Sequence, residues 1–335
     1  MKAGVATENG LEVRDVPQPK PKPFEILLKV KAAGLNRADL AAAQGQGGHG
    51  AVGRTVGIDW AGEVVEVGSE VKGGFKEGDR VMCAGSGGYA EYAVADWGRV
   101  VAIPQGMSFE DAATLPVALG TMHDALVTNG RLKRGESVLI QGASSGVGLM
   151  ALQIAKLLGA KVVIGTSTDA GRRARLKDFG ADLAVDTKDS NWPELVLSAT
   201  DGQGVNLIVD QVSGTLINAS MRASAILGRI VNVGRLGGGK AEFDFDLHAN
   251  RRIAYIGVTH RTRSVDELRE ETRAMWADLA DAVKSRKLGL PIDRTFPLGE
   301  AKAAQEYMRA NRHFGKILLA PREALAQLAA GEAKP

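Results

Sequence analysis

The stretch Ser137-Val-Leu-Ile-Gln-Gly-Ala-Ser-Ser-Gly-Val-Gly148 runs from a short apolar segment into a glycine-rich turn. Residues 149–159 then repeat apolar side chains at helical spacing and end on a glycine. This order predicts a β-strand, a tight turn and an α-helix. Gly146 and Gly148 have no side chains, so the N–H groups that begin the helix can approach a pyrophosphate closely. The sequence therefore predicts a dinucleotide site in the middle of the chain. Its expected contacts in the turn are Ser144, Ser145, Gly146 and Val147.

Residues 1–120 show short strand-like segments at close spacing. They cover 26–33, 62–68, 79–82 and 89–94. Residues 17–23 include four prolines, which cannot donate hydrogen bonds within a sheet, so this segment is expected to be a connector. Short strands separated by turn residues favour an antiparallel, barrel-like β-domain.

From residue 121 the pattern changes to alternating strands and helices. Strands are predicted over 138–141, 161–166, 182–185, 205–210, 229–233 and 253–259, and helices over 147–158, 170–179, 191–200 and 215–226. Alternation at this spacing produces parallel βαβ units. Residues 121–260 are therefore predicted to form a doubly wound parallel sheet.

The last segment, residues 261–335, is predicted to return to the first domain. Helical patterns cover 264–287 and 299–312, and Ser264 with Glu267 has the spacing of a capping box. A strand predicted over 316–320 has no partner among the strands of the nucleotide-binding sheet. We therefore assign it to the β-rich domain.

Composition excludes several classes of protein. The net charge of +3, without a stripe of basic and aromatic residues, argues against nucleic acid as the main partner. There is no run of about 18 apolar residues to span a membrane, and residues 1–10 lack the apolar core of a secretory signal. A cytoplasmic location is expected. Cys83 is the only cysteine, which excludes an intrachain disulfide and a cysteine-rich zinc site.

The end of the second strand in the nucleotide-binding unit bears on the choice of dinucleotide. NAD sites usually place a carboxylate there to bind the ribose 2′-hydroxyl. Here Thr166 and Ser167 occupy the strand end, and Arg172 follows. Hydroxyl and guanidinium groups accept a 2′-phosphate, whereas a carboxylate repels it. The pattern favours NADP(H) with these three residues as contacts. Asp169 is the counter-evidence, because a modest loop shift would turn it inward, and the alternative for Arg172 is a solvated helix face.

Six segments resemble the motifs of one family. They are Ala33-Gly-Leu-Asn-Arg-Ala-Asp-Leu40, Gly57-Ile-Asp-Trp-Ala-Gly-Glu-Val-Val-Glu-Val-Gly68, Gly78-Asp-Arg-Val81, Gly88-Tyr-Ala-Glu-Tyr92, residues 143–148 and Gly228-Arg-Ile-Val-Asn-Val-Gly234. On these motifs the chain resembles the medium-chain dehydrogenase/reductase superfamily, in its zinc-independent quinone oxidoreductase (zeta-crystallin-like) branch. The resemblance covers nearly the whole length. It implies an α/β fold, with a doubly wound parallel Rossmann sheet plus a β-rich GroES-like barrel domain.

Zinc-dependent members of that superfamily carry ligands that this chain lacks. They are similar around residues 34–40 but have a cysteine where Asn36 stands, and a His-Glu pair where Ile58 and Asp59 stand. They also hold a structural zinc with four cysteines in the region where this chain has Cys83 alone. The histidines are scattered, at His49, His123, His248, His260 and His313. We therefore expect no metal site and no metal-activated alkoxide.

The resemblance also implies site residues. Asn36 matches an asparagine near the nicotinamide, so its amide is expected to contact the cofactor and to polarise a substrate carbonyl. The alternative is a residue that caps a helix over 37–43. Further cofactor contacts are expected at Thr121, Ser213, Val233, Gly234, Arg235 and Lys316. Helix packing at Thr121 and a surface loop at 313–316 are the alternatives.

Residues 44–53 depart from the family pattern. Many relatives have a loop with aromatic residues and proline here that covers the substrate, whereas this segment has five glycines and no aromatic residue. No catalytic tyrosine can therefore be carried over. Tyr89 and Tyr92 belong to a predicted strand and are expected to pack in the core or between domains.

Three functions remain open at this point. The first is a zinc-independent NADPH reductase of a quinone or an α,β-unsaturated carbonyl compound. The second is an enoyl-thioester reductase or another specialised alkene reductase, which would share every motif above. The third is a non-catalytic NADPH-binding protein, structural or RNA-binding. Relatives also suggest a homodimer, paired through the apolar strand over 253–259.

Overall fold

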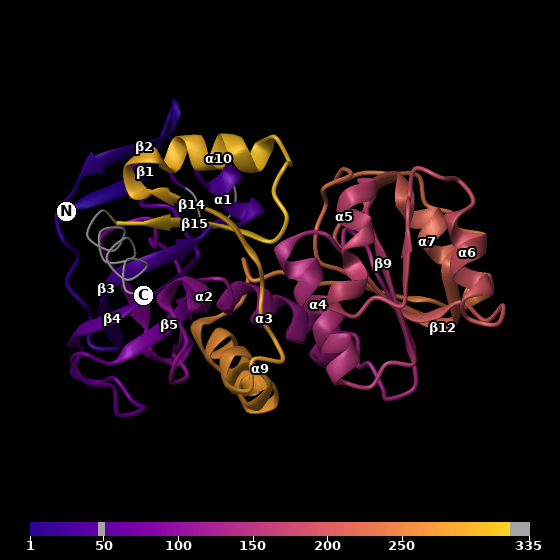
Figure 1. The fold of residues 1–335 in the computed structure, drawn as a ribbon, viewed down its shortest axis with the longest axis horizontal. Coiled ribbons are helices and arrows are strands. Elements are labelled where there is room, and N and C mark those ends of the chain that lie inside the picture. The colour runs from indigo at the N-terminus through magenta and orange to yellow at the C-terminus, as the bar shows by residue number, and fades with distance from the viewer. Residues whose placement is uncertain (46–50, 322–335) are drawn as a thin grey trace, which may run out of the picture. The chain divides into compact units, whose positions relative to one another are not determined.

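The computed structural model describes residues 1–45 and 51–321, and the chain divides into two compact units (Figure 1). One unit is Ala118–His260, and the other is Met1–Val117 together with the chain from Arg261 onward. Residues 46–50 of the glycine-rich segment, with His49 among them, lie outside the described residues. Within the described ranges no helix has the length and apolar character to cross a membrane.

Residues 118–260, all of which the structure describes, form a six-stranded parallel sheet. Its strands are β8 (Ser137–Ile140), β9 (Val162–Thr166), β10 (Leu183–Val185), β11 (Val205–Asp210), β12 (Ser224–Asn232) and β13 (Ala254–Gly257). Their spatial order is β10-β9-β8-β11-β12-β13. Successive strands are added to one side of β8 and then, from β11, to the other. This is the order of the doubly wound fold, so the predicted parallel sheet is confirmed.

Helices cover both faces of this sheet. Figure 1 shows α4 (Gly146–Leu157) and α5 (Ala170–Ala174) on one side, with α6 (Trp192–Ser198) and α7 (Ile217–Ala223) on the other. Shorter elements in the same unit are a π-helical turn over Asp124–Asn129, 3-10 turns over Leu176–Phe179 and Gly214–Leu216, and α8 (Phe245–Arg251). Because both faces are covered, all four residues of β8 are buried and its sequence is almost continuously apolar.

Among residues 1–45, 51–117 and 261–321, seven strands form a mostly antiparallel sheet. The central strand β3 (Glu25–Gly34) pairs with β4 (Asp59–Val67), β6 (Tyr92–Asp96) and β15 (Lys316–Ala320). The sheet continues from β4 to β5 (Arg80–Ala84) and β7 (Val100–Ala102), and from β15 to β14 (Ile292–Pro297). A separate hairpin joins β1 (Lys2–Thr7) and β2 (Gly10–Asp15). The last strand therefore returns the chain to the unit in which it began.

The helices of this unit are α1 (Arg37–Ala42), α2 (Phe109–Ala113), α9 (Val265–Lys284) and α10 (Ala301–Arg309), while α3 (Pro116–His123) crosses the boundary between the units. The capping box predicted at α9 is confirmed. Ser264 Oγ accepts the Glu267 N–H at 3.2 Å, and Glu267 accepts the Ser264 N–H at 2.7 Å. The apolar core contains the fully buried Trp60 and Tyr89.

Several predicted elements have other bounds in the structure. The helix predicted over 215–226 is wrong in its last turn, because α7 ends at Ala223 and the next residue begins β12. The strand predicted over 89–94 starts at Tyr92, since the Tyr89 N–H bonds instead to the Val56 carbonyl. The helix predicted over 170–179 divides into α5 and a 3-10 turn, with Arg175 between them.

Candidate cofactor-binding and reaction sites

The glycine-rich turn joins β8 to α4 at the carboxyl edge of the parallel sheet. Ser145 caps α4, and its Oγ accepts the Gly148 N–H at 3.1 Å. A Cβ atom on Gly148 would lie 2.6 Å from the Ala143 Cα, so only glycine allows the turn to pack this closely. Within residues 118–260, the amides of Gly146 and Val147 have no hydrogen-bond acceptor. They are free to bind an anion at the helix N-terminus.

Thr166, at the end of β9, fastens the turn to the sheet. Its Oγ1 accepts the Gly142 N–H at 2.9 Å and donates to Gln141 Oε1 at 3.0 Å, while its carbonyl accepts the Ala143 N–H at 2.9 Å. The side chain is 2% exposed. The structure thus gives the Thr166 hydroxyl partners within the protein, and Ser167, the next residue, also contacts the turn.

Ser167, the predicted Arg172 and the neighbouring Arg173 lie near the end of β9. Ser167 Oγ lies 3.1 Å from Ser144 Oγ, which brings two predicted cofactor residues together. Arg173 Nη1 donates to the Ser167 carbonyl at 2.8 Å and to Asp186 Oδ2 at 2.9 Å. Arg173 is therefore paired within the protein at the sheet edge. Arg172 lies on α5, with its Nε 3.7 Å from Asp169 Oδ1.

Asp169 is the N-cap of α5. Its Oδ1 accepts the Arg172 N–H at 2.8 Å, and this backbone hydrogen bond lowers the pKa of the Asp169 carboxyl. A carboxylate committed to a helix cap is less available to bind a ribose hydroxyl. The Ser144 and Ser167 hydroxyls and the Arg172 guanidinium also lie at this edge of the sheet.

A second polar group lies at the ends of β11 and β12. Asn232 Nδ2 donates to Ser213 Oγ, which also lies 2.8 Å from the Gly234 carbonyl. Asp210 Oδ1 accepts the N–H groups of Val212 and Ser213, and burial raises the pKa of the Asp210 carboxyl. Ser213 has φ 58° and ψ −144°, a conformation that few non-glycine residues adopt.

The other predicted cofactor contacts in this unit are Val233, Gly234, Arg235 and Thr121. Val233 and Gly234 donate their N–H groups to the Asp210 carbonyl at 2.8 and 3.1 Å, which joins them to the Ser213 group. Arg235 follows as an exposed side chain. Thr121 lies partly exposed on α3, and within residues 118–260 no hydrogen bond connects it to the other predicted contacts.

Sequence reasoning missed two glutamines that connect these groups. Gln211 Oε1 lies 3.1 Å from Ser145 Oγ, and Gln211 Nε2 donates to the Gln141 carbonyl at 3.1 Å. Both are buried at the carboxyl ends of parallel strands. A polar residue directly after an apolar strand is the signal that would have found them, because this edge is where such sheets bind ligands.

In the other unit, Lys316, Asp59 and Asn36 form a buried polar cluster. Lys316 Nζ donates to Asp59 Oδ2 at 2.8 Å and to Asn36 Oδ1 at 3.0 Å. The Lys316 and Asp59 side chains are 4% and 0% exposed. Burial raises the pKa of Asp59, and the Lys316 ammonium opposes this shift. Lys316 and Asn36, two predicted site residues that lie far apart in the sequence, are thus in direct contact.

Asn36 is the N-cap residue of α1, as the alternative interpretation of the sequence predicted. Its Nδ2 lies 3.3 Å from the Gly34 carbonyl and 3.5 Å from Asp59 Oδ2, both at the long end of hydrogen-bond distances. The Asn36 N–H instead donates to Asp39 Oδ2 at 2.8 Å. Asp39 also accepts the Tyr89 hydroxyl at 2.7 Å, and burial raises the pKa of Asp39 to about 7. Tyr89 is thus a buried partner of α1.

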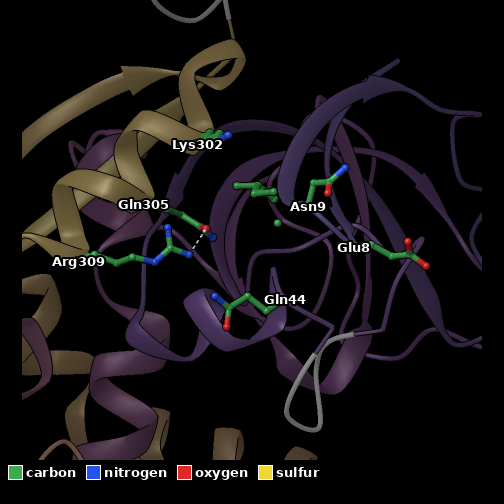
Figure 2. Close-up of a pocket in the computed structure, with 8 residues that line it drawn as sticks. Glu8, Asn9, Gln44, Lys302, Gln305 and Arg309 are labelled. Atoms are coloured by element: carbon green, nitrogen blue, oxygen red, sulfur yellow. Dashed lines mark hydrogen bonds between the residues drawn. The ribbon is translucent and has the colours of Figure 1, made fainter.

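A separate hollow of about 550 Å³ lies in the same unit, and Figure 2 shows the residues that line it. It is lined by the β1–β2 turn, by Gln44 after α1 and by Lys302, Gln305 and Arg309 on α10. Gln305 Nε2 donates to the Asp39 carbonyl at 3.2 Å. This buried glutamine therefore links α10 to α1 by a hydrogen bond. None of the predicted site residues lines the hollow.

Metal ligands were also sought throughout residues 1–45 and 51–321. In these ranges no three His, Cys, Asp or Glu side chains are grouped so that they could hold a metal ion. Cys83 is 1% exposed, and burial raises the pKa of its thiol well above the usual range. It therefore has the environment of a buried apolar residue.

Comparison with known proteins identifies the family. A family model described as the alcohol dehydrogenase GroES-like domain matches residues 22–105, and one described as zinc-binding dehydrogenase matches residues 146–281. A mycobacterial protein solved with NADPH is 30% identical, with a TM-score of 0.87, over 96% of this chain and 100% of that one. The chain belongs to the medium-chain dehydrogenase/reductase superfamily. The predicted GroES-like and Rossmann architecture is thereby confirmed.

The other relatives of this dehydrogenase/reductase include a quinone oxidoreductase and several polyketide synthases. The quinone oxidoreductase of Escherichia coli, solved with NADPH, is 25% identical with a TM-score of 0.85, covering 96% of this chain and 99% of that one. A phenolphthiocerol synthesis polyketide synthase of Mycobacterium bovis is 32% identical over 306 residues, which are 90% of this chain but 14% of the synthase. The chain thus spans less than a fifth of the length of the polyketide synthases that it matches. These likenesses support an oxidoreductase that uses a nicotinamide cofactor.

Proposed function

We propose that this protein is a zinc-independent reductase that transfers a hydride from NADPH to a quinone or an α,β-unsaturated carbonyl compound. The observation that carries the proposal is the donor set at the carboxyl edge of the parallel sheet. Free turn amides, the paired Ser144 and Ser167 hydroxyls and Arg172 lie there, while the Asp169 carboxylate is held in a helix cap. The relatives solved with NADPH are consistent with this choice of cofactor.

The cofactor would be held by residues of several strand ends. The amides of Gly146 and Val147 suit the pyrophosphate, because a helix N-terminus carries partial positive charge. Ser167 and Arg172 suit the 2′-phosphate. The proposed contacts also include Asn36, Thr121, Ser144, Ser145, Thr166, Ser213, Val233, Gly234, Arg235 and Lys316. When bound, NADPH supplies a hydride, and the protein supplies position and electrostatic stabilisation.

Reduction leaves negative charge on the substrate oxygen, so the site needs a hydrogen-bond donor for it. Asn36 is the donor expected from the family resemblance, and its Nδ2 contacts within the protein are long enough to be exchanged for a substrate oxygen. Water can supply the final proton to an enolate or phenolate. The reaction therefore requires no strong general acid.

An enoyl-thioester reductase is the second candidate. It is favoured by the similarity to polyketide synthases. The two candidates share the hydride transfer and differ in the substrate, since a thioester carries a long acyl carrier and a quinone does not. Comparing the specificity constants kcat/KM for both substrate classes decides between them.

NADPH oxidation by the purified protein against quinones, enones and enoyl thioesters tests the proposal. We expect turnover with at least one of these classes and tighter binding of NADPH than of NADH in a fluorescence titration. Arg172→Ala should weaken NADPH binding about tenfold or more and leave NADH binding nearly unchanged, because only the former has a 2′-phosphate. Arg175→Ala, an exposed arginine at the end of the same helix, is the control.

The zinc-independent part of the proposal has its own test. Cys83 is the only cysteine, so the four-cysteine site of zinc-dependent relatives cannot form. Dialysis against EDTA should leave both the rate and the thermal midpoint of unfolding unchanged. A rate that falls and returns on addition of Zn²⁺ contradicts this part of the proposal and leaves the choice of NADPH untouched.

A further inference from the structure

The cluster at Lys316 contains one hydrogen-bond donor that the protein does not use. A lysine ammonium has three N–H groups. Within the described residues Lys316 Nζ has two acceptors, Asp59 Oδ2 at 2.8 Å and Asn36 Oδ1 at 3.0 Å. The Lys316 side chain is 4% exposed, so water does not readily satisfy the third N–H. A buried donor without an acceptor is costly unless a ligand binds to it.

The surrounding chain is shaped to hold this ammonium in place. A Cβ atom on Gly34 would lie 3.1 Å from Lys316 Nζ and 2.5 Å from the Ala113 carbonyl oxygen. The glycine therefore leaves room for the lysine head group at the end of β3. Asp59 Oδ1 lies 3.3 Å from the Val117 N–H, so the carboxylate that orients Lys316 is itself fixed by the backbone.

The cluster reaches the surface at Asn36. Asn36 is partly exposed, whereas Lys316 and Asp59, which contact it, are buried. Asn36 is therefore the member of the cluster that a ligand can reach first. A cation in this low-dielectric setting stabilises a negative oxygen far more than a neutral amide does.

We propose that Lys316 is the catalytic residue that binds the developing oxyanion of the substrate through its third N–H, and that Asp59 is its positioning residue. This inference rests on the proposed reductase function, places Lys316 on the substrate oxygen instead of on the cofactor, and assigns Asn36 a supporting role. Such a site suits any carbonyl substrate whose oxygen becomes an enolate or phenolate.

The reaction balances without a protein acid. The β-carbon of the enone gains a hydride from NADPH, which leaves NADP⁺, and the π electron pair of the C=C bond moves through the carbonyl group to oxygen. Lys316 keeps its three protons and holds the enolate oxygen. The α-carbon then takes one proton from water, which gives the saturated carbonyl compound and regenerates the carbonyl group.

The decisive variant is the double substitution Lys316→Met with Asp59→Asn. It removes the ammonium without leaving an unpaired buried carboxylate, so folding is preserved better than in Lys316→Met alone. We expect kcat to fall by about 100-fold or more, with the Kd for NADPH changed by less than about threefold. Lys287→Met, an exposed lysine of the same unit, is the control for loss of charge.

Binding of 4-nitrophenol in the presence of NADP⁺ provides a readout that does not depend on turnover. Its absorbance reports whether the bound ring is phenol or phenolate. The wild-type protein should lower the pKa of the bound phenol by about one unit or more, because a cation lies beside its oxygen. The double variant should lose that shift, whereas Lys287→Met should keep it.

The outcomes separate this inference from the proposed function. A wild-type protein that reduces no quinone, enone or enoyl thioester overturns the reductase function, and the phenolate shift still decides whether Lys316 binds an oxyanion. Unchanged kcat in the double variant, or no phenolate shift in the wild type, overturns the role of Lys316. A raised Kd for NADPH with unchanged kcat would make Lys316 a cofactor contact instead.

Discussion

At the scale of single residues, the carboxyl group of Asp39 links stability to pH. Burial raises its pKa to about 7, although it accepts hydrogen bonds from Tyr89 and from the Asn36 N–H. Its Oδ1 atom is buried without a partner in the described chain. In the unfolded chain the pKa of an aspartate is about 3.9. Asp39 therefore holds its proton in the folded state over a range in which the unfolded state has lost it.

The sign of the effect follows from this difference. Between about pH 4 and pH 7 the folded state binds more protons, so the free energy of unfolding falls as pH rises. The contribution of Asp39 is complete below about pH 4 and is lost as pH passes 7, with an upper bound of about 4 kcal/mol. Urea unfolding across this range should show a shallower pH dependence for Asp39→Asn than for the wild type. An equal slope in both proteins would contradict the prediction, and Glu77→Gln, at an exposed site, is the control.

Ser213 offers a second test at this scale, because its backbone is strained. Its φ of 58° and ψ of −144° lie in a region that costs about 1–3 kcal/mol for a residue with a Cβ atom. Ser213→Ala and Ser213→Gly both remove the hydroxyl that contacts Asn232 and Gly234. Only the glycine variant also relieves the strain. We expect it to be more stable than the alanine variant by about 1–3 kcal/mol in urea unfolding, and the reverse order would show that the strain is absent.

At the scale of elements, local signals predicted those helices and strands whose ends and faces are encoded nearby. The helix α4 was predicted within one residue at each end, because Ser145 caps it and a glycine at 159 follows it. The strand β14 was missed because Asp293, Arg294 and Thr295 make half of it polar, and only its pairing with β15 decides its conformation.

The candidate site shows the same division between local and long-range information. The turn residues and the end of β9 were predictable, since strand, turn and helix follow each other directly in the sequence. Lys316 and Asn36 are 280 positions apart, and no local pattern indicates that they touch. Their assignment to one site came from the family resemblance, and the role of Asp59 emerged only from the structure.

At the scale of the whole molecule, the chain is a two-unit module whose relatives occur both as separate reductases and within much longer synthases. The quinone oxidoreductases are matched over nearly their full length, whereas the polyketide synthases are matched over a small part. The two units are built from discontinuous segments, because the chain returns to the β-rich unit after His260.

Self-association is the last property that belongs to this scale. The strand β13 is the edge of the six-stranded sheet and pairs only with β12, so the outer side of its backbone lacks a sheet partner within residues 118–260. Tyr255 on this strand is 43% exposed, and the nearby chain exposes Ile226 and Phe245 by 59% and 76%. An apolar edge strand is a template for pairing with a second copy. We therefore expect two chains to join through β13.

Light scattering after size-exclusion chromatography should then give about twice the chain mass of 35.2 kDa. Tyr255→Lys should shift the protein toward the monomer, because symmetry would bring two added charges together at the paired edge. Val265→Lys adds the same charge at a 53% exposed site on α9 and should leave the mass unchanged. A wild-type protein that elutes as a monomer at micromolar concentration would exclude the β13 interface. NADPH binding by the Tyr255→Lys monomer would further show that the nucleotide site is complete within one chain.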